Sequence, residues 1–225
     1  GDLSASVVDG NLSLSGQGTD SHKGTDLQNT TLISYGLGDI TISGTSAGTG
    51  GAGGDTFGVD FSGSIQSLGT GNINISGTAN DVLAPSHGVQ ISADIKTVSG
   101  NVKISGTGNG GDYPGTALSY SGNIEAQGAA NVDLEGIGAG STGLSFGGTI
   151  SIVDGDLSMI GRSNASSRNA AIHGLSFNQA TITGETGLLY FGGSAQLPPI
   201  DAISPYTNRA INYRNTSVSS TSGII

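Results

Sequence analysis

A seven-residue segment that returns throughout the chain constrains the fold more than any other feature. Its first copy is Gly10-Asn11-Leu12-Ser13-Leu14-Ser15-Gly16. It returns near residues 38, 71 and 100, more loosely near 130 and 155, and in shortened form near 187. Each copy alternates apolar and polar residues, which predicts a β-strand with one buried face. A strand repeated at such steps predicts a solenoid whose stacked coils bury a common core.

Two further short alternating segments fit inside each step, for example 58–61 and 64–68, and then 88–91 and 94–98. The sequence therefore predicts an all-β fold over residues 1–196. The predicted fold is a right-handed parallel β-helix, or β-solenoid, of about seven coils with three short strands each. Only 34% of residues are hydrophobic, which is little for a globule. It suits a thin rod, because most of each coil faces water.

The predicted core is a column of inward-facing apolar pairs, with polar residues between them pointing outward. These pairs are Leu12 with Leu14, Ile40 with Ile42, Ile73 with Ile75, Val102 with Ile104, and Val132 with Leu134. The residue before each strand is Asn or Asp, and stacking would align these side chains. Stacked Asn amides form hydrogen-bonded ladders. We expect such a ladder here, with the charges of Asp39 and Asp156 interrupting it.

The repeat stops at residue 197. Pro198 and Pro199 cannot continue a ladder, because proline lacks a backbone donor. Residues 197–225 are therefore predicted to form a separate segment. Three interpretations stay open for it: a cap on the end of the rod, a docking tail, or a linker.

The length of the step varies mainly after the first strand, in segments 45–55, 78–86, 107–115 and 162–170. Insertions would then project from one corner of the rod, and a variable corner is often where a solenoid binds its ligand. The candidate binding side chains at this insertion corner are Asp55, His87, Asp112, Tyr113, Arg162 and Arg168. Two Asn-x-Ser/Thr sequons, at Asn29 and Asn164, are expected in loops and are candidates for glycosylation.

One Gly-rich segment, residues 50–57, fits a calcium-binding nonapeptide and makes Asp55 a candidate metal ligand. Calcium needs several oxygen ligands from successive turns, and the motif occurs once. The competing interpretation is a plain Gly-rich loop, and no other cofactor is expected. No pair of carboxylates suited to glycoside hydrolysis emerges, so we expect no enzyme activity and no catalytic residues. An ice-binding surface would need a regular threonine array, and only Thr181-Ile182-Thr183 has that form.

Charge and hydropathy exclude several partners. The formal net charge of −10 would repel a phosphate backbone, so nucleic acid is not expected as a partner. No apolar run is long enough to span a bilayer. The chain has no cysteine, which excludes disulfides and thiolate metal sites.

The repeat also carries a family resemblance. A Gly, then Asn or Asp, then an alternating strand ending in Ser-Gly-Thr, resembles the β-helical shafts of filamentous-haemagglutinin-like exoproteins over residues 10–192. These are passengers of two-partner secretion in Gram-negative bacteria and include high-molecular-weight adhesins and biofilm matrix adhesins. The resemblance implies a secreted protein at the bacterial cell surface.

The role that the resemblance implies is that of a structural or adhesive shaft in a large surface protein. Its partners would be a cell-surface glycan or protein, or copies of itself joined end to end. Two alternatives stay open. One is a module that binds a glycan or host protein through its insertion corner, and the other is a polysaccharide-degrading β-helix enzyme.

Overall fold

The computed structural model describes residues 2–19, 23–48, 54–81, 83–110, 115–164, 173–195 and 209–225. Within these residues the only regular elements are β-strands, which form two sheets. A seven-stranded sheet contains β2 (Leu12–Thr19), β4 (Ile40–Ala47), β6 (Ile73–Asn80), β8 (Val102–Asn109), β10 (Val132–Ala139), β12 (Leu157–Ser163) and β15 (Leu189–Ala195). A ten-stranded sheet contains β1 (Leu3–Val7), β3 (Thr25–Ser34), β5 (Thr56–Ser67), β7 (Ser86–Thr97), β9 (Thr116–Ala126), β11 (Thr142–Ile152), β13 (His173–Asn178), β14 (Thr181–Gly184), β16 (Arg209–Arg214) and β17 (Ser217–Ser220).

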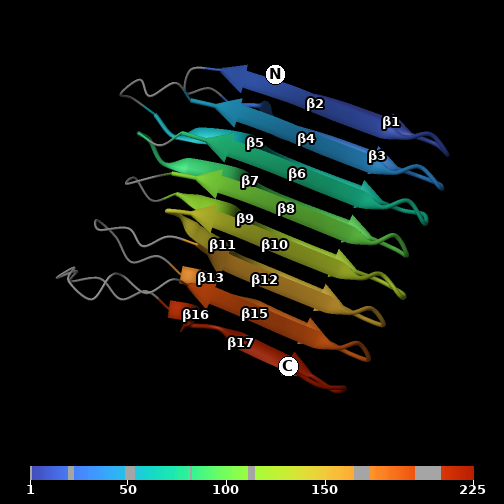
Figure 1. The fold of residues 1–225 in the computed structure, drawn as a ribbon. Helices are drawn as coiled ribbons and strands as arrows, with labels where there is room; N and C mark the ends of the chain where they lie inside the picture. The colour runs from blue at the N-terminus through green and yellow to red at the C-terminus, as the bar shows by residue number, and fades with distance from the viewer. Residues whose placement is uncertain are drawn as a thin grey trace.

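The chain alternates between the two sheets and advances by one strand each time it returns. The seven-stranded sheet runs β2, β4, β6, β8, β10, β12, β15, and every pair in it is parallel. Figure 1 shows the strands stacked from the N-terminus at one end to the C-terminus at the other. The chain is thus an all-β parallel β-solenoid, as the repeat predicts, and it has about six turns. Among the described residues there is no helix of the length and hydropathy that a membrane span requires.

The predicted inward pairs form the core. The register aligns Ile42 with Leu14 on one side and with Ile75 on the other. Ile40, Ile73, Val102 and Val132 form a parallel column and are fully buried. Each such side chain contributes roughly 1.5–3 kcal/mol to stability when it leaves water. Leu12 and Leu14 are only partly buried, because they lie in β2, the edge strand of this sheet.

The two further short strands expected in each coil are continuous in most of the molecule. For example, β5 pairs with β7 from Thr56 to Ser67 without a break in register. The chain bends inside the strand instead, at glycines with positive φ: Gly63 at 129°, Gly122 at 145° and Gly148 at 146°. The last coils differ, since β13 and β14 are separate strands, as are β16 and β17.

Strand pairing resumes beyond the point where the sequence repeat stops. β16 pairs with β13, and β17 pairs with β14, both in parallel. Ile224 then forms a bridge with Leu189. Residues 209–225 therefore extend the solenoid at its C-terminal end, covering one side of β13, β14 and part of β15.

The side-chain ladder at the turns exists, but its chemistry differs from the expected one. The Oδ1 atom of each residue accepts a hydrogen bond from the backbone N–H of the equivalent residue one coil later. This holds for Asn11 with Asp39 (3.0 Å), Asp39 with Asn72 (2.7 Å), Asn72 with Asn101 (3.0 Å), Asn101 with Asn131 (2.9 Å), Asn131 with Asp156 (2.8 Å) and Asp156 with Leu188 (2.8 Å). The expectation that aspartate interrupts the ladder is wrong, because only an acceptor is needed and a carboxylate supplies one.

Candidate functional site

The insertion corner is aligned from coil to coil. The strands that lead into it end in register, with Ala47 beside Asn80 and Asn80 beside Asn109. The strands that leave it begin in register as well, with Thr56 beside Ser86. The described ends of the variable segments therefore lie along one edge of the rod.

Two of the predicted corner residues meet. The Nε2 atom of His87 lies 3.8 Å from the Oδ2 atom of Asp55. The ring of His87 stacks on Phe57, which is its partner in the neighbouring strand, at a centroid distance of 4.9 Å. Its Nδ1 atom accepts a hydrogen bond from the backbone N–H of Thr116 at 3.3 Å. In the neutral ring the proton is therefore on Nε2, which faces Asp55.

A lysine joins this group from the coil before. The Nζ atom of Lys23 lies 2.6 Å from Asp60 and 3.1 Å from Asp26, and 5.6 Å from the ring centre of Phe57. We call Lys23, Asp26, Asp55, Phe57, Asp60 and His87 the corner cluster. Sequence reasoning found only Asp55 and His87 here, since Lys23 and Asp60 belong to neighbouring coils and only the register unites them.

Burial and charge act in opposition on the two bases of the corner cluster. Burial lowers the pKa of His87, and the negative charges of Asp55 and Asp60 offset this only in part. For Lys23, burial also lowers the pKa, but hydrogen bonds and charge from Asp60 and Asp26 together hold the pKa above its usual value. His87 is therefore neutral and Lys23 charged near neutral pH, which makes the cluster a mixed polar and aromatic surface.

Calcium binding at Asp55 stays a prediction. In the described part of the chain, no three His, Asp or Glu side chains are grouped so that they could hold a metal ion. Residues 50–53 of the Gly-rich motif lie outside the described residues. Asp55 itself is half exposed and faces His87.

The other predicted binding and glycosylation residues fall in different places. Arg162 lies in β12 rather than in an insertion, and it pairs with Glu135 of β10. Asn29 is not in a loop but inside β3, where its φ of 51° marks a break in the pairing of β3 with β5. Asn164 follows the end of β12 and is exposed. Asp112, Tyr113 and Arg168 lie outside the described residues.

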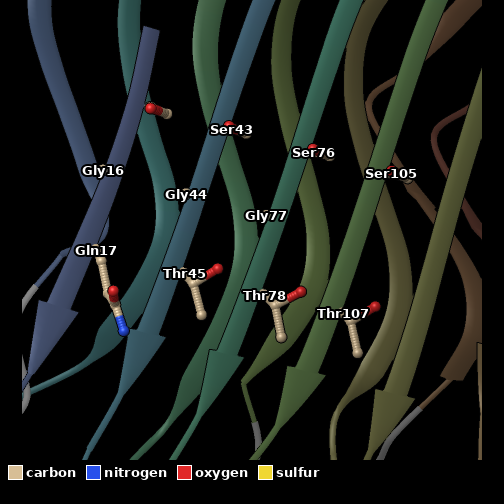
Figure 2. A pocket seen from close by; sticks show the side chains of 11 residues that line it. Gly16, Gln17, Ser43, Gly44, Thr45, Ser76, Gly77, Thr78, Ser105 and Thr107 are labelled. Carbon is tan, nitrogen blue, oxygen red and sulfur yellow. The ribbon is translucent and has the colours of Figure 1, made fainter.

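A groove that sequence reasoning missed crosses the outer face of the seven-stranded sheet. It has a volume of about 560 Å³ and spans β2, β4, β6 and β8. Its walls are two rows of side chains that the register aligns (Figure 2). One row is Ser15, Ser43, Ser76 and Ser105, and the other is Gln17, Thr45, Thr78 and Thr107. We call this feature the hydroxyl groove.

Glycines form the floor of the hydroxyl groove. Gly16, Gly44 and Gly77 lie between the two rows and face the interior. Beneath them the two sheets meet backbone to backbone. A Cβ atom placed on Gly44 would lie 1.9 Å from the carbonyl oxygen of Gly58, and one on Gly77 would lie 2.0 Å from that of Gly88. Because no side chain fits at these positions, the rod is thin here and its outer face is hollow.

The hydroxyls of the groove have no hydrogen-bond partner in the described part of the chain. Within the described residues, none of the Ser and Thr side chains that line the groove makes a hydrogen bond to another protein atom. By contrast, Ser34, Ser67 and Thr97 lie at the C-terminal ends of β3, β5 and β7, and each of their hydroxyls donates to a carbonyl of the following turn at 2.5–2.6 Å. The groove therefore presents donors and acceptors that only solvent or a ligand can satisfy.

The sequence signal for the hydroxyl groove is the recurrence of Ser-Gly-Thr at 43–45, 76–78 and 105–107.

Comparison with protein-family models, with curated proteins and with solved structures finds no match to this chain.

Proposed function

We propose that this chain is a shaft segment of a large secreted bacterial surface protein, with a structural or adhesive role and no catalytic one. The finer architecture that we propose with it is a right-handed helix of about seven coils, each counted as three short strands. The resemblance of the repeat to the shafts of filamentous-haemagglutinin-like exoproteins motivates both parts, including export by two-partner secretion.

The observation that carries the proposal is the uniformity of the stack. From β2 to β15, each strand of the seven-stranded sheet pairs with the next in parallel and in register. The ladder of Asn and Asp oxygens repeats at every turn. In such a one-dimensional stack, each coil contacts only its neighbours and adds a fixed increment of length. A spacer needs these properties.

Rigidity is the first property to test. The chain has no cysteine, so a pair of spin labels can be introduced cleanly at Ser13→Cys and Tyr190→Cys. These outward positions lie in one row, six strand steps apart, so we expect a narrow distance distribution at ~29 Å. The pair Ser13→Cys and Asp133→Cys is the control and should give ~19 Å. Broad distributions for both pairs would rule out a stiff shaft.

Catalysis is the outcome that would overturn the proposed role. The purified chain should be incubated with polygalacturonate and with neutral polysaccharides, and the release of reducing ends measured. We expect none above the buffer. Cleavage that disappears in an Asp60→Asn variant would place an active site in the corner cluster and contradict a shaft. If the Asp60→Asn variant still cleaves, the Asp94→Asn and Asp133→Asn variants should be assayed next. Loss of cleavage in either of them would also contradict a non-catalytic shaft.

A second candidate function is binding at the insertion corner, favoured by the corner cluster. The stacked pair of Phe57 and His87 with flanking charges is the kind of mixed aromatic and polar surface that recognises glycans and proteins. A glycan array and a host-cell adhesion assay should compare the whole chain with a variant shortened between Ala47 and Asp55. Binding that is lost on shortening favours this role over a passive shaft.

A further inference from the structure

We propose that the hydroxyl groove binds a neutral polysaccharide chain, which lies along the axis of the rod across β2, β4, β6 and β8. This inference does not depend on the proposed shaft role, because an isolated module would bind in the same way. Thr45, Thr78 and Thr107 begin segments that were expected at the insertion corner, but they lie inside β4, β6 and β8 and line the outer face of the sheet. The groove is thus separate from the corner cluster.

The direction of the ligand follows from the two rows. The serine row and the Thr/Gln row both run along the rod, one residue per strand, and the glycine floor lies between them (Figure 2). Adjacent strands are ~4.8 Å apart, so the four strands offer equivalent hydroxyls over about 14 Å. A linear molecule with hydroxyls along both edges can meet both walls at successive strands.

The chemical class follows from the lining. A side-chain hydroxyl is one donor and two acceptor lone pairs, and it rotates to suit its partner. A sugar hydroxyl has the same capacity, so the two sets can pair in either direction. Within the described residues, the hydroxyls of the groove have no hydrogen bond to give up on binding. The β-branched Thr45, Thr78 and Thr107 are also stiff at χ1. Little rotamer freedom is therefore lost when a ligand orders them.

The charge of the ligand follows from the same residues. Among the residues that the structure describes, no Lys, Arg, His, Asp or Glu lines the groove. The chain as a whole carries a net charge of −10, which disfavours an acidic polysaccharide. The serine row ends at β10, where Glu135 takes the position that Ser105 holds in β8. In the next outward row, Lys103 of β8 lies between Asn74 and Asp133, so charged residues flank the groove without lining it. The groove is thus matched to an uncharged chain over a defined length.

The concave shape favours a polymer chain over an ordered water surface. Ice recognition needs a flat array, whereas here the backbone contact beneath Gly44 and Gly77 leaves a hollow between the rows. A hollow of about 560 Å³ is comparable to ligand pockets, which range over ~300–1,000 Å³. Among the described residues, no aromatic or large aliphatic side chain lines it, so we expect weak binding at each strand that accumulates along a longer chain.

The test is a titration of the isotope-labelled chain with neutral oligosaccharides of the malto-, cello-, laminari- and chito- series, followed by NMR. Polygalacturonate fragments serve as the acidic comparison. We expect at least one neutral series to shift the amide signals of 43–45, 76–78 and 105–107. The affinity should rise with oligosaccharide length until the ligand spans the four strands, and the acidic fragments should not compete.

A groove variant and a matched control locate the binding. The groove variant combines Ser43→Ala, Thr45→Val, Ser76→Ala and Thr78→Val. The control makes the same kinds of change on outward residues of the ten-stranded sheet, namely Thr149→Val, Ser151→Ala, Thr181→Val and Ser217→Ala. Since each hydrogen bond adds modest net free energy, we expect the groove variant to bind about tenfold more weakly and the control to bind like the original chain.

Four outcomes would overturn the proposal. They are a failure of every neutral series to bind, equal affinity in the groove variant, preference for the acidic fragments, and inhibition of ice growth without sugar binding. If the groove variant does not fold, the shifts mapped on the unmodified chain decide alone. Shifts confined to the insertion corner would then contradict the groove.

Discussion

At the turn that precedes each strand of the seven-stranded sheet, one side-chain oxygen holds one coil to the next. Asn72 accepts from the backbone of Asn101, and Asp39 accepts from that of Asn72 in the same geometry. The position therefore selects for an oxygen two bonds from Cβ and not for an amide. This explains why the ladder accepts Asp at positions 39 and 156 and Asn at the others.

Substitutions at Asn101 test this requirement. Asn101→Asp keeps the acceptor for the backbone N–H of Asn131, so stability should change by less than about 0.5 kcal/mol. Asn101→Ala removes it and should lower the free energy of unfolding by about 1 kcal/mol. Urea unfolding of the two variants and the original chain measures the difference. Equal losses in both would mean that the amide nitrogen matters after all.

The stacked His87 predicts a pH dependence of stability. Its folded-state pKa is below the ordinary value of 6.5, so the unfolded chain binds the proton more tightly. Neutral His87 therefore makes its full contribution to the free energy of unfolding above about pH 6.5, and this contribution is lost as the pH falls below that value. Burial and the charge of Arg209 also lower the pKa of His173, so this residue changes the stability with pH in the same direction.

Removal of the imidazole should flatten this profile. His87→Asn keeps an acceptor near the position of Nδ1 but cannot titrate, so its unfolding free energy should fall less between about pH 7.5 and about pH 5. His173→Asn is the parallel variant, and the double variant should be flattest. Urea unfolding at several pH values gives the curves. A His87→Asn curve parallel to that of the original chain would show that the lowered pKa is absent.

At the scale of strands and sheets, glycine sets how closely the two sheets approach. The column that includes Gly44, Gly77 and Gly106 faces inward at the same register position in successive strands. At each of these positions, a Cβ atom would lie about 2 Å from a backbone oxygen of the other sheet. The same contact creates the hollow of the hydroxyl groove.

Gly44→Ala should therefore be among the most damaging small substitutions in the chain. The added methyl group would meet the carbonyl oxygen of Gly58 at 1.9 Å, so the sheets must separate locally. We expect a loss of about 1–3 kcal/mol, typical of an overpacked interior. The control is Ser43→Ala on the outer face, which should cost under about 0.5 kcal/mol. Thermal unfolding of the two variants compares them, and equal melting temperatures would contradict the close approach.

Strand existence could be predicted from the sequence better than strand continuity. Alternation identified every strand of the seven-stranded sheet, including the shortened copy that forms β15. The bend inside β5 escaped prediction because Gly63, at φ 129°, redirects the strand while its neighbours keep their pairing. Glycine in a sequence commonly marks the end of a strand, and only the partner strand reveals that pairing continues through it.

For the whole molecule, the identical register of successive coils makes a coil removable. Deletion of residues 71–99 would join Thr70 to Gly100 and place β4 beside β8, with Val102 taking the place of Ile73 and Asn101 taking the place of Asn72. We expect a folded rod that is shorter by ~4.8 Å between labels at positions 13 and 190. Circular dichroism and the label distance test this.

A deletion out of phase is the matched control for the coil deletion. Removing residues 71–90 deletes all of β6 and the first part of β7, and it joins the rest of β7 directly to Thr70. The apolar columns then lose their register. This variant should fail to fold. A folded product from the out-of-phase deletion, or an unfolded one from 71–99, would contradict a stack of independent coils.

The candidate sites were less predictable than the rod that carries them. Asp55 and His87 were placed at one corner by the variable segments, but their contact depends on the pairing of Phe57 with His87. The hydroxyl groove was overlooked because outward Ser and Thr residues are the usual surface of a solenoid. Their significance comes from the depth of the glycine floor, which depends on the opposite sheet.

The ladder has a mechanical consequence, because its bonds and those of the strands lie along the rod. A force that draws the two ends apart is carried by every coil, but an end coil can peel away while the others stay paired, so the rod should unwind one coil at a time from its ends. The coil between Asn72 and Asn101 spans 29 residues, which reach about 100 Å when extended, against ~4.8 Å when stacked. Under tension such a rod acts as an extensible tether, lengthening roughly twentyfold coil by coil while its covalent chain stays intact.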